Sequence, residues 1–123
     1  DNMLIKQYEV TILNRLKLEL GNKEYYSDEV YKTLLEENGL VWEDDYNKED
    51  HEIGLLNTVI AILETLSNDV DIMRKISSND LLTVDQAYKY LSQRIYNLKA
   101  KVIELEEAKE EYTGNINPIF FTR

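Results

Sequence analysis

Apolar residues recur at steps of three and four along most of this chain, and the longest such stripe lies in its C-terminal third. A stripe with this spacing predicts a coiled-coil seam or one long helix of a bundle. At 1.5 Å per residue that helix would be roughly 40 Å long. The stripe is interrupted only by Lys109 and consists of Val84, Tyr88, Leu91, Ile95, Leu98, Val102, Leu105 and Tyr112.

Three further segments carry a helical period, so we expect an all-α fold, a small bundle of about four helices occupying residues 1–112. Four glycines and one proline in 123 residues suit such a fold. Gly21-Asn22 and Asn38-Gly39 would end the first two helices. Ser27 would cap the second helix, and Thr83-Val84-Asp85-Gln86 has the pattern of a capping box for the last. The three segments are about Met3–Leu20, Asp28–Glu37 and His51–Ile76.

The third segment has the widest apolar face and is expected to be the central, most buried helix. Gly54 near its start would allow close contact with another helix. In the irregular stretch before it, Trp42 is expected to pack on the bundle as a lid. The inner face of the short second helix is predicted to consist of Val30, Tyr31, Leu34 and Leu35.

Residues 113–123 are expected to form an extended C-terminal arm, because Pro118 blocks regular helix. Burying the large apolar side chains of the arm would stabilise by roughly 1.5–3 kcal/mol each, so the arm needs a receptor surface, either on its own domain or on another chain. We expect it to bind another chain. Its predicted partner-binding residues are Ile116, Pro118, Ile119, Phe120, Phe121 and Arg123. The end of the last helix is predicted to add an oligomer seam of Val102, Leu105 and Tyr112.

The formal net charge is −10, and a net of −8 lies between Asp28 and Glu52. Such acidity argues against wrapping free nucleic acid, which needs Lys and Arg to replace phosphate counterions. Solubility is its simplest explanation. The chain shows neither a run of about 18–20 apolar residues nor a signal-peptide pattern, so we expect no membrane association.

Chemistry-bearing patterns are sparse. There is no cysteine, and His51 is the only histidine, beside Asp50 and Glu52 at an expected helix start. The acidic run from Asp44 fails as a calcium loop, since its sixth residue is Glu49 rather than glycine. Pairs of carboxylates such as Glu49 and Glu52 lack a matching pair on a facing helix. We therefore expect no enzymatic activity, no cofactor and no dedicated metal site.

The order of elements resembles the small helical head–tail connector (adaptor) proteins of tailed bacteriophages. The matching features are Tyr26-Ser27-Asp28-Glu29 with Leu34-Leu35-Glu36-Glu37, a long apolar helix, a Ser/Asn/Asp break with Leu82-Thr83-Val84, and an amphipathic helix over Asp85–Glu107. The likeness covers about Tyr26–Glu107. Two features depart from the family pattern: the acidic stretch over 41–50 is longer, and the first helix runs on further.

The resemblance implies a structural protein of the virion, located at the head–tail junction and assembled in the host cytoplasm. Members of that family form a ring, commonly of twelve copies, beneath the portal protein and next to a tail or stopper protein. The implied ring lines a conduit through which DNA passes without being bound specifically. The arm as a clasp for the portal or a neighbouring subunit is our own inference from its apolar residues.

The sequence is also compatible with two other function classes. The first is a soluble regulatory or DNA-mimic interaction protein, dimeric through its C-terminal helix and using its acidity to occupy a DNA-binding partner. The second is a carboxylate-metal hydrolase of small phosphates. A stable DNA-binding protein partner would favour the first, and stabilisation by Mg²⁺ or Mn²⁺ would favour the second.

Overall fold

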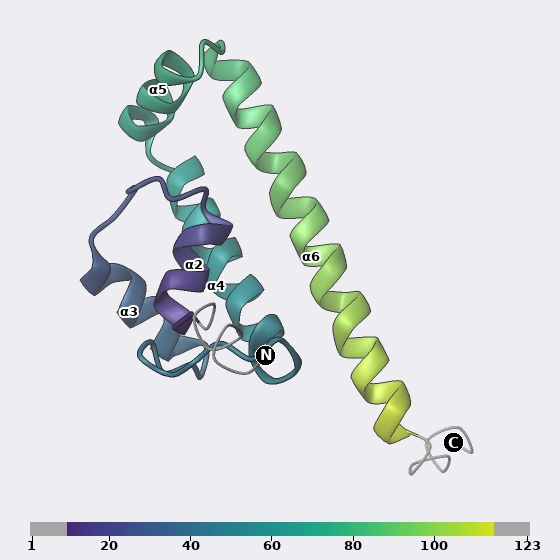
Figure 1. Ribbon diagram of the computed structural model, residues 1–123. Helices are drawn as coiled ribbons and strands as arrows, with labels where there is room; N and C mark the ends of the chain where they lie inside the picture. The colour runs from purple at the N-terminus through teal and green to yellow at the C-terminus, as the bar shows by residue number, and fades with distance from the viewer. Residues whose placement is uncertain (1–9, 115–123) are drawn as a thin grey trace, which may run out of the picture.

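The structure, a computed structural model, describes residues 10–114, of which 112–114 are described by their backbone alone. In this part of the chain five helices form a small bundle (Figure 1). A single isolated β-bridge joins Thr11 to Asp45 in the same part of the chain. The all-α prediction is confirmed. The helices are α2 (Ile12–Glu19), α3 (Asp28–Glu37), α4 (Lys48–Ser67), α5 (Val70–Asn79) and α6 (Val84–Gly114).

Helix α2 begins at Ile12, and the predicted start near Met3 is wrong for residues 10 and 11. The Thr11 side chain accepts a hydrogen bond from the Asn14 N–H (3.2 Å), as an N-cap does. The backbone before it pairs with the loop that precedes α4: the Tyr46 N–H donates to the Val10 carbonyl oxygen (2.8 Å). This pairing takes an extended backbone, so helix cannot continue through it. Residues 3–9 of the predicted helix lie outside the described residues.

Helix α3 spans the predicted residues. The Ser27 side chain accepts from the Val30 N–H, and Gly39 closes the helix end with a φ of 79°. Tyr31 and Leu35 are buried, but Val30 is 39% exposed, so its predicted place on the inner face is wrong.

The predicted third helix is two helices. α4 ends at Ser67 and α5 begins at Val70, with a 97° bend between them. The Asp69 carboxylate accepts from the Ile72 N–H (3.1 Å) and caps α5. None of the described helices is by itself long and apolar enough to cross a membrane, and α4 with α5 meet that test only jointly, across this bend.

Helix α6 has the predicted capping box. The Thr83 N–H donates to Gln86 Oε1 (2.9 Å), and the Gln86 N–H donates to Thr83 Oγ1 (3.0 Å). With 31 residues the helix is roughly 46 Å long. It lies along α5 and α4 and continues beyond the first turn of α4 (Figure 1). An ion pair joins Lys99 of α6 to Glu64 of α4 (2.9 Å).

The core is centred on α4, as predicted. The larger cluster joins α4 to α2 and α3, and its fully buried α4 members are Leu55, Val59, Ile62 and Leu66. A smaller cluster joins α4 to α6 and consists of Leu56, Ile60 and Val102. Trp42 packs against the larger cluster, with Lys32 Nζ 4.0 Å from its ring centroid, so its predicted place on the bundle is confirmed.

Gly54 lies where the end of α3 approaches α4. A Cβ at this position would lie 3.1 Å from the Asn38 carbonyl oxygen and 3.1 Å from Leu40 Cγ. Next to it, Thr58 is fully buried and donates its hydroxyl to the Gly54 carbonyl oxygen (2.8 Å), while Asn38 Nδ2 donates to Thr58 Oγ1 (3.1 Å). The close contact predicted at Gly54 is therefore made with the C-cap of α3 and with the loop that follows it.

Thr58→Val should lower the free energy of unfolding by about 1–3 kcal/mol, because it keeps the shape but leaves the Asn38 amide without this acceptor. Thr65→Val is the matched control. Thr65 makes the same bond to the carbonyl oxygen four residues earlier (2.9 Å to Ala61) but is exposed. Urea unfolding followed by circular dichroism measures both. Equal losses would contradict a special role for the Asn38–Thr58 bond.

Candidate interaction site between α4 and α6

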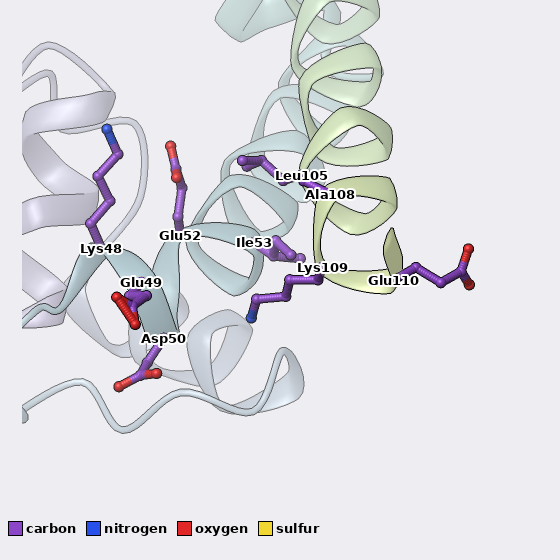
Figure 2. Close-up of a pocket in the computed structure, with 9 residues that line it drawn as sticks. All are labelled: Lys48, Glu49, Asp50, Glu52, Ile53, Leu105, Ala108, Lys109 and Glu110. Carbon is purple, nitrogen blue, oxygen red and sulfur yellow. The ribbon is translucent and has the colours of Figure 1, made fainter. Parts of the chain in front are cut away.

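A groove of about 1080 Å³ lies between the first turns of α4 and the last turns of α6. The two helices diverge here, and side chains from both face the space between them (Figure 2). The volume is slightly above the roughly 300–1,000 Å³ range of small-molecule sites. Its lining residues are Lys48, Glu49, Asp50, Glu52, Ile53, Leu105, Ala108, Lys109 and Glu110.

The floor of the groove is apolar. Ile53 of α4 and Leu105 of α6 are half-buried and pack against the smaller core cluster. One turn after Leu105 along α6 lies Ala108, which is exposed and whose small side chain does not fill the groove. These three side chains continue the α4–α6 core outward to a surface that the described residues do not cover. A partner side chain that docked here would extend an existing core.

The rim of the groove is mainly acidic. Glu49 and Asp50 lie in the first turn of α4, where the helix dipole favours negative charge. Lys109 extends from α6 toward α4, whereas Glu110 points away from α4 (Figure 2). Four carboxylates against two lysines give the lining a net charge of −2.

His51 has a structural role beside this rim. The Asn47 N–H donates to His51 Nδ1 (2.8 Å), and Asn47 Oδ1 accepts from the Asp50 N–H (3.2 Å). Both side chains thus satisfy backbone donors at the start of α4. Among the described residues, no group of three or more His, Cys, Asp or Glu side chains is arranged to hold a metal ion.

Three tyrosines have shifted ionisation, and all lie outside the groove lining. Burial raises the pKa of Tyr25 and Tyr26, and the pKa of Tyr46 is raised by burial although the Arg15 charge opposes the shift. The Arg15 guanidinium lies 5.3 Å from the Tyr46 ring centroid. These hydroxyls therefore remain protonated at neutral pH.

One of the three residues of the predicted oligomer seam is buried within the chain. Val102 is 6% exposed and packs on Leu56 and Ile60 within the chain, and its predicted role in an oligomer seam stays a prediction. Leu105 is half-buried and reaches the groove floor. The side chain of Tyr112 lies outside the described residues.

The arm was predicted to begin at residue 113, but residues 113 and 114 are the last two of α6. The rest of the arm, residues 115–123 with the predicted partner-binding residues Ile116 to Arg123, lies outside the described residues and stays a prediction. Its point of attachment is described: α6 ends at Gly114, one turn beyond the groove-lining Glu110. The sequence did not single out Ile53 or Ala108 as site residues. Ile53 lies in the apolar segment His51–Ile76, whose period predicts a core residue rather than a site residue, and a small residue such as Ala108 gives no signal of a groove.

Three comparisons with known proteins found no match for this chain. They were a scan against protein-family models, a search of curated proteins and a search of solved structures.

Proposed function

We propose that this protein is a structural head–tail connector of a tailed bacteriophage, which assembles as a ring under the portal protein. The observation that supports this most is the course of α6. It continues beyond the start of α4 and ends at Gly114, close to an apolar groove (Figure 1). The arm with its four large apolar side chains follows directly. A domain that presents such a segment at one end is suited to joining molecules.

Ring assembly agrees with the physical character of these parts. Each copy would offer an arm and a groove, which are different surfaces. Contacts between different surfaces are heterologous, and they form a ring when the rotation from one copy to the next closes. Repeating a modest contact around a closed ring raises the overall affinity through avidity. The acidic surface would let DNA pass with little binding, because it lacks the cations that replace phosphate counterions.

The proposal predicts that the protein forms a defined complex with a portal protein. The portal partner is the one encoded in the same gene cluster, where portal and capsid genes are expected upstream. Size-exclusion chromatography with light scattering, alone and after mixing, should show co-elution at the ring stoichiometry of the portal. A chain that remains monomeric and does not co-elute with the portal would contradict the proposed function.

One observation favours the second candidate, an acidic regulatory or DNA-mimic protein. Five carboxylates on the loop before α4 and its first turn are exposed: Glu43, Asp44, Asp45, Glu49 and Asp50. A row of surface carboxylates can imitate the phosphates of DNA. Recovery of a DNA-binding protein by pull-down, with competition by duplex DNA, would support this function in place of the connector.

A further inference from the structure

We propose that the groove between α4 and α6 is the receptor for the C-terminal arm, residues 115–123, of a second copy of this chain. The inference deepens the proposed function and rests on it, since it names the contact by which neighbouring subunits of the ring would join. Ile53, Leu105 and Ala108 form the floor that receives the apolar side chains of the arm.

The chemistry of the arm matches the groove. Ile116, Ile119, Phe120 and Phe121 supply apolar surface, and Arg123 is the only charged residue of the arm. The positive charge suits a lining with a net charge of −2. Residues 1–9, which precede the described part of the chain, contain Asp1, Lys6 and Glu9 and carry a net charge of −1. Charge complementarity therefore favours the arm as the occupant.

The reach of the arm is sufficient for a neighbouring copy. Nine extended residues span at most about 30 Å, and packed helices lie about 8–10 Å apart. An arm entering its own groove would have to reverse direction immediately after Gly114, because the groove lies back along α6 toward Leu105. Pro118 and the residue before it favour extended backbone, which suits an arm that continues away from its own helix.

The contact is tested first with a labelled, amidated peptide of residues 113–123 and a chain lacking residues 115–123. Fluorescence anisotropy should show saturable binding. Ala108→Arg in the receptor chain should weaken this binding about tenfold or more, because it fills the floor and repels Arg123. The matched control is Ala100→Arg, which makes the same change at an exposed α6 position outside the groove lining.

Sedimentation equilibrium of the full chain then identifies which molecule supplies the arm. We expect association that grows with concentration, is lost in Ala108→Arg, and persists in Ala100→Arg. A full chain that is monomeric at every concentration, although the peptide binds the shortened chain, would place the arm in its own groove and overturn the proposal. Absence of peptide binding, or equal weakening by both arginine variants, would also overturn it.

These outcomes are separable from those of the proposed function. Arm exchange between copies requires no portal, so self-association that depends on the groove can be found in a protein that ignores the portal. Conversely, co-elution with the portal that survives Ala108→Arg unchanged would retain the connector function and reject the groove as the subunit contact.

Discussion

Leu16→Ala is expected to lower the free energy of unfolding by about 2–5 kcal/mol, the usual loss for a large-to-small change in a packed core. Leu16 is fully buried in the larger core cluster, where α2 packs against α4. Removing its side chain forfeits apolar burial and leaves a cavity that the α4 residues cannot fill. Because domains of this size are typically stable by about 5–15 kcal/mol, the urea midpoint should fall markedly.

Leu18→Ala is the control that makes this result specific. Leu18 lies two residues further along α2 and is 51% exposed. The chemical change and the difference in helix propensity are the same, so the two variants differ mainly in burial. We expect Leu18→Ala to stay within about 0.5 kcal/mol of the parent chain. Similar losses for the two variants would mean that α2 does not face α4 as described.

Helix ends that depend on neighbouring residues were predictable from the sequence. Ser27 and Gly39 bound α3, and Thr83 with Gln86 opens α6, because each of these signals acts within a few residues of the backbone group that it satisfies. The position of α4 at the centre of the bundle followed from its wide apolar face, since such a helix must be covered on several sides.

Two features required knowledge of contacts distant in sequence. The apolar period of the first segment predicts helix at Val10 and Thr11, but the backbone of these residues pairs with the loop near Tyr46. The break at Asn68-Asp69 was hidden because Met73 and Ile76 continue the apolar period of α4 across it. Only the cap formed by Asp69 marks the new helix, and the same residue type is common on exposed helix faces.

The candidate site was predictable in part. The sequence indicated that α6 is long and that an apolar segment follows it, and the helix is confirmed. It did not show which part of the stripe is used inside the chain. Val102 and Leu105 have the same periodicity as the rest of α6. Only the length and angle of α4 decide that Val102 is buried while Leu105 lines a groove.

Deleting residues 116–123 is expected to leave the helices intact and to abolish self-association and portal binding. The two core clusters of the described chain draw on residues from Ile12 to Leu105, so the domain has a core without the arm. Far-UV circular dichroism should show unchanged helical content per molecule, and the free energy of unfolding of the monomer should change by less than about 1 kcal/mol. Sedimentation equilibrium should show a monomer.

A second variant separates the chemistry of the arm from its length. Replacing Ile116, Ile119, Phe120 and Phe121 by Ser keeps every backbone group and Arg123 but removes the apolar surface, so it should behave as the deletion does. If association survives these four changes, main-chain contacts or the arginine hold the copies together and the apolar contribution is small. If the shortened chain unfolds, the arm stabilises its own bundle. In that case burial of the four side chains, each contributing roughly 1.5–3 kcal/mol, would belong to the folding of the monomer rather than to assembly.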